Sequence, residues 1–172
     1  TAELEEALRA NEAITNALRA SEERFRGLVS QSLVGITIFE GGTITYANDT
    51  FSAIFGRSEE ELKALDPATL YHPDDLPEVQ EHVRRRFAGE VESSEYRVRG
   101  VRPDGSIVYV EIHGNTMNLN GERVLISMYL DVTDRVAAEN ELLLLQEQLR
   151  ETSVRDALTG LHNRRHFETC PA

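Results

Sequence analysis

The hydrophobic period of this chain changes twice, and the changes divide it into three segments. Residues 1–30 contain no proline, and mostly apolar or small side chains recur there every seven residues in two series. The series are Leu4, Asn11, Leu18 and Phe25, and Ala7, Ile14, Ser21 and Leu28. This heptad pattern predicts a helix that pairs with another helix. The polar Asn11 either fixes the register of that pairing or faces solvent.

The middle segment has the features of short β-strands joined by turns. Residues 35–40 and 43–46 are predicted to form a hairpin around Gly41-Gly42. Three more strands are predicted at 95–102, 106–117 and 123–130. Between the two groups, Ser58 and Glu61 have the spacing of a capping box, and residues 76–88 predict a longer helix that ends at Gly89.

The third segment returns to a helical period. Thr133 can cap a helix, and Asp134 is favourable in its first turn. Ala138, Leu142, Leu145 and Leu149 follow with 4-3-4 spacing, which predicts a second coiled-coil helix. Leu143 and Leu144 widen this stripe, so a broader bundle interface is the alternative.

Charge and cysteine content exclude several classes of function. The formal net charge of -12 disfavours binding to nucleic acid or to an anionic membrane surface. The single cysteine, Cys170, excludes an internal disulfide or a cysteine-based metal site and fits a reducing, cytoplasmic setting. No apolar run approaches the ~20 residues of a membrane-spanning helix, and no direct membrane contact is expected.

Six motifs in the middle segment, taken in order, resemble those of a PAS domain. They are Glu23–Val29, Tyr46–Phe51, Gly56, His72–Asp75, Arg102–Ser106 and Asp131–Asp134. The resemblance implies an α+β PAS fold, with a five-stranded antiparallel sheet and helices on one face that enclose a small pocket. It also implies that Asp74 or Asp75 caps the helix at 76–88, and that N- and C-terminal coiled-coil helices flank the domain and hold a homodimer together.

The PAS resemblance also orients the strands. Val108, Val110 and Ile112 lie on one face, which by the family pattern points inward. Ile126, Met128 and Leu130 are then apolar side chains on the outer face, where Ile36 and Ile38 can join them. An apolar outer face needs a cover, which the N-terminal helix or a partner subunit would supply.

Residues 156–165 resemble the opening sequence of a diguanylate cyclase (GGDEF) domain. The signature Gly-Gly-Asp/Glu-Glu-Phe loop does not occur, because Gly41-Gly42 is followed by Thr and Ile. No catalytic residue is therefore predicted, and this chain is not expected to be an enzyme. The expected organisation is an N-terminal signalling helix at 1–21, a PAS domain at 22–134, a coiled-coil linker at 135–155 and a truncated start of a GGDEF domain at 156–172.

Seven side chains are candidates for the lining of the pocket, with a filled core as the alternative. They are Phe39, Phe51, Phe55, His82, Tyr96, Ile112 and Tyr129. A photoreactive flavin would need a cysteine within residues 48–56, and heme would need a histidine near residues 75–78; neither is present, although His82 lies one turn further on. Heme and flavin are disfavoured, and no cofactor is assigned.

Two clusters of polar residues have more than one interpretation. His72, Asp74 and Asp75 lie within one turn without a fourth ligand, so no metal site is predicted. The run Arg84–Arg86 is either a solvated helix face paired with glutamates or an anion site for a carboxylate ligand.

The predicted function is that of a regulatory sensor and dimerisation module of a cyclic-di-GMP synthase. A small-molecule ligand, or a signal from an upstream module, would act through a coiled-coil stalk on the cyclase domain. The residues predicted to transmit it are Asp131, Thr133, Asp134, Leu142, Leu145, Leu149 and Asp156. The alternatives are a ligand-free dimerisation and relay module, and a heme- or flavin-binding redox or gas sensor.

Overall fold

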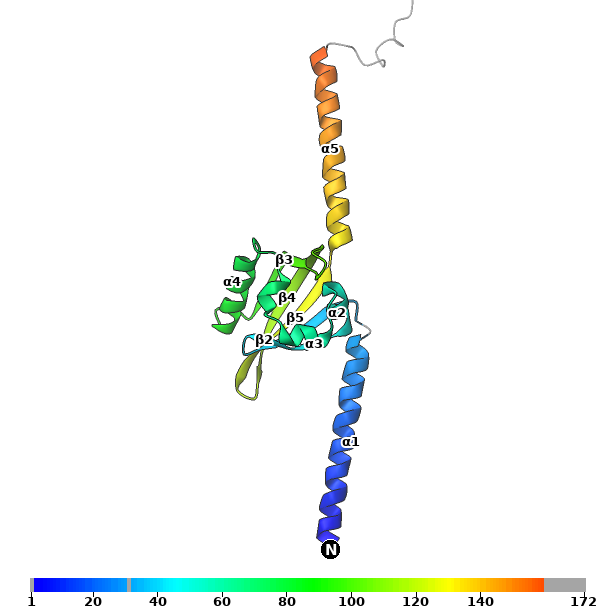
Figure 1. Ribbon diagram of the computed structural model, residues 1–172, viewed down its shortest axis with the longest axis vertical. Helices are drawn as coiled ribbons and strands as arrows, with labels where there is room; N and C mark the ends of the chain where they lie inside the picture. Colours follow the sequence, from blue (N-terminus) through cyan, green and yellow to red (C-terminus); the bar gives the residue numbers. More distant parts are fainter. Residues whose placement is uncertain (1, 31, 160–172) are drawn as a thin grey trace, which may run out of the picture. The chain divides into compact units, whose positions relative to one another are not determined.

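The computed structural model describes residues 2–30 and 32–159, with side chains at 2–29 and 32–152. Five strands and five α-helices lie along it, together with one short 3₁₀ helix (Figure 1). In chain order they are α1 (Ala2–Ser30), β1 (Gly35–Glu40), β2 (Thr43–Ala47), α2 (Asp49–Phe55), α3 (Glu59–Ala64), η1 (Pro67–Leu70), α4 (Leu76–Phe87), β3 (Ser93–Val101), β4 (Ile107–Leu119), β5 (Glu122–Asp131) and α5 (Thr133–Thr159).

The strands form one antiparallel sheet in the order β2-β1-β5-β4-β3. The first and last strands along the chain, β1 and β5, are therefore neighbours inside the sheet, where Gly35 pairs with Tyr129 and Thr37 with Ser127. Helices α2, α3 and α4 pack on one face of this sheet. The expected α+β fold, with five antiparallel strands and helices on one face, is confirmed.

Alternation along the strands places the core between the sheet and these helices. Val108, Val110 and Ile112 of β4 are fully buried, as predicted, together with Phe51 and Phe55 of α2. On β5, Ile126 is half-buried while Met128 and Leu130 remain 38% and 37% exposed. The outer face of the sheet is thus apolar at its centre, as the strand pattern predicts.

Local sequence signals explain most helix ends. Ser58 and Glu61 form the predicted capping box at the start of α3. Asn48 caps α2 by accepting a hydrogen bond from the amide of Phe51. Helix α4 ends before Gly89, which has a positive φ of 74°. These contacts satisfy backbone groups that a helix end leaves without partners.

The expectation that Asp74 or Asp75 caps α4 is wrong. Asp75 occupies the N-cap position, but its side chain makes no capping hydrogen bond. Its carboxylate instead accepts hydrogen bonds from the backbone N–H and the Nε of Arg99 on β3, at 2.8 and 3.0 Å. A charge-assisted pair with a guanidinium is stronger than a bond to a single amide, so Asp75 fastens the start of α4 to the sheet.

The long helices α1 and α5 bear exposed apolar side chains. Side chains 2–28 of α1 are all exposed, including Leu4, Ile14, Leu18 and Leu28. The chain divides between Val132 and Thr133 into two compact units, and α5 lies in the second. None of the described helices is long and apolar enough to cross a membrane.

Candidate functional site

A cavity of about 300 Å³ lies between α4 and the inner face of the sheet. Its apolar wall comes from β1, β2, η1, α4 and β5, and consists of Phe39, Ile44, Pro67, Ala68, Leu76, Val79, Val83 and Leu125. Its polar lining consists of Thr37, Tyr71, Arg86, Tyr96, Ser127 and Tyr129. Gly42, Asp66, Gln80 and Arg84 also line it and are exposed to solvent. An apolar pocket with a few converging polar groups is typical of small-molecule sites.

The cavity lies over a row of small residues on the sheet. Ser94, Gly114, Ser127 and Thr37 are successive cross-strand partners on β3, β4, β5 and β1. The neighbouring row carries larger side chains, with Tyr96, Ile112 and Tyr129 paired in the same order. The drop in side-chain size between these rows leaves room beneath α4.

The side chain of Arg86 fills part of this room. It is 2% exposed, and its Nη1 donates a hydrogen bond to the hydroxyl of Ser127 at 3.2 Å. Its Nε donates to the carbonyl oxygen of His82 at 3.4 Å. A β-carbon on Gly114 would overlap Nη1 of Arg86, so the guanidinium lies directly against the backbone of β4. A buried cation in an apolar cavity is uncommon and demands polar partners.

Three tyrosine hydroxyls add to the polar lining. The hydroxyls of Tyr71 and Tyr129 are hydrogen-bonded to each other at 3.0 Å. The third, Tyr96, has its ring stacked on the ring of His82, with centroids 4.0 Å apart. Burial raises the pKa of Tyr71 and of Tyr96 well above their ordinary value of 10.0. Both phenols therefore stay protonated at neutral pH and remain hydrogen-bond donors.

The seven predicted pocket residues fall into three groups. Phe39, Tyr96 and Tyr129 line the cavity. The other aromatic and aliphatic candidates, Phe51, Phe55 and Ile112, are fully buried in the adjoining core. His82 is not among the lining residues: its ring stacks on Tyr96, and its Nε2 lies 3.9 Å from a carboxylate oxygen of Glu78.

Sequence reasoning left out Arg86 as an individual residue, together with Tyr71, Thr37 and Ser127. A signal for Arg86 was present in the helical period. Leu76, Val79, Val83 and Arg86 lie at i, i+3, i+7 and i+10, so Arg86 belongs to the apolar face of α4. Arg84 and Arg85 lie on its solvated face and pair with Glu81 and Glu90.

The residues predicted to transmit a signal lie at the end of β5 and along α5. Asp131 is the last residue of β5, and its carboxylate lies 3.7 Å from Nη2 of Arg102. Thr133 is the first residue of α5, and Asp134 follows in its first turn. Leu142, Leu145 and Leu149 are 58%, 51% and 71% exposed. Asp156 belongs to α5 by its backbone, while its side chain and residues 160–172 lie outside the described part of the chain.

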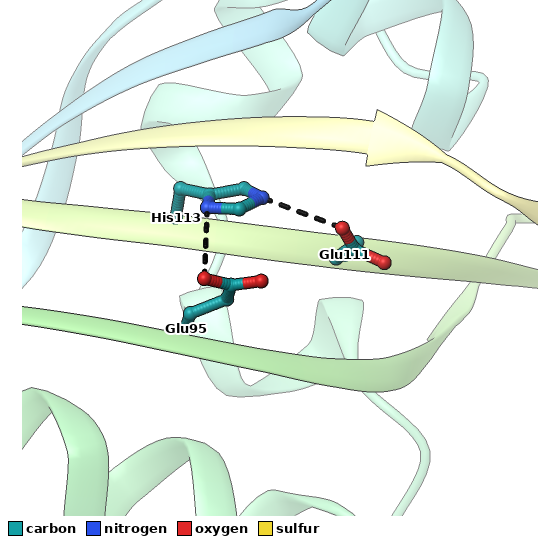
Figure 2. A group of neighbouring side chains, drawn as sticks. All are labelled: Glu95, Glu111 and His113. Atoms are coloured by element: carbon teal, nitrogen blue, oxygen red, sulfur yellow. Dashed lines mark ion pairs between the residues drawn. The ribbon is translucent and has the colours of Figure 1, made fainter.

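The outer face of the sheet carries a group of charged side chains with metal-ligand chemistry. Glu95, Glu111 and His113 present ligand atoms within 4.8 Å of one another (Figure 2). His113 Nδ1 lies 3.6 Å from Glu95 and its Nε2 lies 3.4 Å from Glu111, while Arg97 approaches Glu111 at 3.7 Å. Each ring nitrogen already faces a carboxylate and a cation already balances Glu111, so we interpret the group as a surface ion-pair network.

Two curated proteins are similar to most of the chain. The uncharacterized protein y4lL of Sinorhizobium fredii is 32% identical over 152 residues, which is 86% of this chain and 18% of that protein. The sensor histidine kinase TmoS of Ectopseudomonas mendocina is 26% identical over 149 residues, or 84% of this chain and 15% of the kinase. The chain thus spans less than a fifth of the length of either relative.

Solved structures and a family model match the domain at the centre of the chain. The PAS domain of an HTR-like protein from Haloarcula marismortui has a TM-score of 0.60 and 25% identity, covering 70% of this chain and 98% of that domain. The N-terminal domain of a diguanylate cyclase with PAS/PAC sensor from Marinobacter aquaeolei shares the fold, with a TM-score of 0.52 and 20% identity over 59% of this chain and 97% of that domain. Half of the chain, residues 44–129, matches the model of the PAS fold. The chain therefore belongs to the PAS-fold family of sensory and signalling domains.

Proposed function

We propose that this chain senses a small molecule in the cavity and passes the signal through α5 to a diguanylate cyclase domain. The observation that carries the proposal is that β5 both lines the cavity and leads along the chain into α5. Ser127 and Tyr129 of β5 line the cavity, β5 ends at Asp131, and α5 begins at Thr133. A ligand that moves either side chain acts on the strand that leads directly into α5.

The proposed mechanism is a population shift between two arrangements of a dimeric stalk. A ligand changes this equilibrium only by binding one arrangement better than the other. Contacts to Tyr129 and Ser127 can supply that difference. Only one residue separates the end of β5 from the start of α5, so a displacement of β5 would act on the first turn of α5. Two cyclase domains must meet face to face to join two GTP molecules, so the register of the stalk would set their activity.

The exposed apolar side chains of the long helices support a homodimer. Leu4, Ile14, Leu18 and Phe25 of α1 are 53–72% exposed, as are Leu142 and Leu145 of α5 at 58% and 51%. Repeated large apolar side chains on a solvent-facing helix indicate a surface that binds another protein. A second copy of the chain presents the same two stripes, which can pair in parallel coiled coils.

The assignment of a cyclase as the output domain is supported by residues 156–165 and by the fold shared with the N-terminal domain of the Marinobacter cyclase. The similarity to TmoS makes a histidine kinase the competing output. The test is to incubate the full-length protein with GTP and Mg²⁺ and separate the products by chromatography. Cyclic di-GMP is the expected product, whereas autophosphorylation from ATP without cyclic di-GMP would identify a kinase.

Sensing is tested by native mass spectrometry of the chain purified under non-denaturing conditions. We expect a bound small mass that is lost on denaturation. Val79→Phe, which fills the cavity from α4, should remove this mass, while Leu119→Phe at an exposed end of β4 should leave it unchanged. A spectrum without the mass, together with a Val79→Phe variant more stable than the wild type, would contradict sensing.

That outcome would favour a ligand-free relay module, the second candidate. The observation in its favour is that Phe51, Phe55 and Ile112 are fully buried. These three pocket candidates therefore fill the core and do not line the cavity. A heme or flavin sensor has less support, because the ring of His82 is stacked on Tyr96 and its Nε2 is turned toward Glu78. The absorption spectrum of the purified chain separates this alternative from the other two.

A further inference from the structure

We propose that the cavity binds a small organic acid whose carboxylate pairs with the guanidinium of Arg86. The proposal rests on the sensory function above and specifies the chemical class of the ligand. Its starting point is the positive charge of Arg86, which no acidic side chain in the described part of the chain balances.

Arg86 lies in the cavity wall as a cation that has no anionic partner among the side chains that the structure describes. Its contacts are the hydroxyl of Ser127, the carbonyl oxygen of His82 and the side chain of Tyr96, all of them neutral. Among side chains 2–29 and 32–152, no carboxylate forms an ion pair with it, whereas Arg84 and Arg85 beside it pair with glutamates. A buried cation without a counter-charge is strongly destabilising, so its retention in the cavity indicates an anion supplied from outside.

The fold keeps open the space that this guanidinium occupies. Gly114 lies beneath it, and any side chain at that position would displace Nη1 of Arg86. Ser127, the cross-strand partner of Gly114, is small enough to leave room and still accepts a hydrogen bond from Arg86. This pair of residues holds the guanidinium against the sheet, and a planar guanidinium presents paired N–H donors that match a carboxylate.

The tyrosines add neutral donors for the same anion. One hydrogen bond joins the hydroxyls of Tyr71 and Tyr129, and either oxygen can be its donor. Such a pair has two hydroxyl hydrogens and uses one, so the other remains for an acceptor on the ligand. Since burial raises the pKa of Tyr71, its phenol stays protonated and can donate to a carboxylate.

The rest of the lining specifies the body of the ligand. Val79, Val83 and Leu125 present only hydrocarbon, and Phe39 adds an aromatic ring. The volume of about 300 Å³ lies at the lower limit of small-molecule pockets, which suits a compact apolar body. One guanidinium balances a single carboxylate, whereas a phosphate monoester carries more charge than this cavity can compensate.

The test is isothermal titration calorimetry of the whole chain, after removal of any bound mass by refolding. The probes are acetate to octanoate, benzoate, phenylacetate and succinate, each paired with its neutral amide, together with phenyl phosphate. We expect at least one carboxylate to bind about tenfold or more tightly than its amide. Arg86→Gln should reduce that affinity about tenfold or more, Arg86→Lys should restore part of it, and Gly114→Ala should weaken it by displacing the guanidinium.

Arg85→Gln is the matched control, because it makes the same chemical change on the solvated face of the helix. This variant should bind the carboxylate as tightly as the wild type does. If Arg86→Gln fails to fold, the comparison of acids with amides on the wild type still decides. Three results would each overturn the proposal: no binding of any carboxylate at millimolar concentration, equal affinity for an acid and its amide, or tighter binding of phenyl phosphate than of every carboxylate. A neutral bound mass in the native spectrum would refute the carboxylate while leaving sensing intact. A spectrum without any bound mass, together with a Val79→Phe variant more stable than the wild type, would refute both.

Discussion

Asp75 illustrates how a single side chain can connect two elements that lie far apart in sequence. Its carboxylate is 18% exposed and holds both the backbone and the guanidinium of Arg99, while neighbouring Asp74 is 73% exposed. We expect Asp75→Asn to lower the free energy of unfolding by about 1 kcal/mol, a value that allows for solvent screening of Arg99. Asp74→Asn, with the same chemistry, should have little effect. Equal urea midpoints for the two variants would contradict this role.

The Asp75 pair also predicts a dependence on acid pH. Hydrogen bonds from Arg99 hold the pKa of Asp75 below its ordinary value of 3.8. The stabilisation is therefore present above pH 3.8 and is lost as the pH falls through the lowered pKa. Wild type and Asp75→Asn should converge in stability as the pH falls through this range, as measured by urea unfolding.

The buried tyrosines predict how stability changes at alkaline pH. Burial raises the pKa of Tyr71 and Tyr96 above the ordinary 10.0, so the folded state holds protons that the unfolded state releases. Stability should fall as the pH rises above 10.0, by up to about 1.4 kcal/mol per pH unit for each group. Tyr96→Phe should make this alkaline decline shallower in urea unfolding. Parallel declines for variant and wild type would show that Tyr96 does not contribute to it.

At the scale of elements, Asn48 joins three of them. Its Oδ1 accepts from the amides of Ile36 and Phe51, and its Nδ2 donates to the carbonyls of Val29 and Val34. Asn48→Asp keeps both acceptor bonds but places a carboxylate against two carbonyl oxygens. Because the site is 3% exposed, we expect a loss of about 2–3 kcal/mol in the free energy of unfolding. Asp49→Asn, at the exposed neighbouring position, is the control, and a loss no larger than that of the control would contradict the role of Asn48.

Elements with local signals could be predicted from sequence, and contacts between distant elements could not. Gly41-Gly42 and the Ser58 capping box each lie within a few residues of the structure that they specify. The pairs Asp75–Arg99 and Arg86–Ser127 join residues 24 and 41 positions apart, and their formation depends on how α4 packs on the sheet. Helical period alone places Arg86 on the apolar face of α4. Only the register of β4 and β5 reveals that Gly114 and Ser127 make room for it.

At the scale of the whole molecule, the two long helices are expected to hold two copies together. Replacing Leu142 and Leu145 with Glu puts like charges into the proposed seam and should shift sedimentation from dimer toward monomer. Leu143→Glu with Leu144→Glu introduces the same charges outside the 4-3-4 series and should leave the dimer in place. An equal loss in both double variants would indicate the broader bundle interface, and no loss in either would contradict a stalk at α5.

The pairing of β1 with β5 at the centre of the sheet has a consequence for the order of the chain. Gly35 and Tyr129 are partners, so the polypeptide enters and leaves the domain at adjacent points. Domains with neighbouring ends tolerate circular permutation. A short tether between residues 29 and 132, which keeps the Val29 and Val34 carbonyls that bind Asn48, with new termini opened at the exposed Asn120-Gly121 turn, should retain the fold. The same proximity would let such a domain be inserted into a loop of an unrelated host protein.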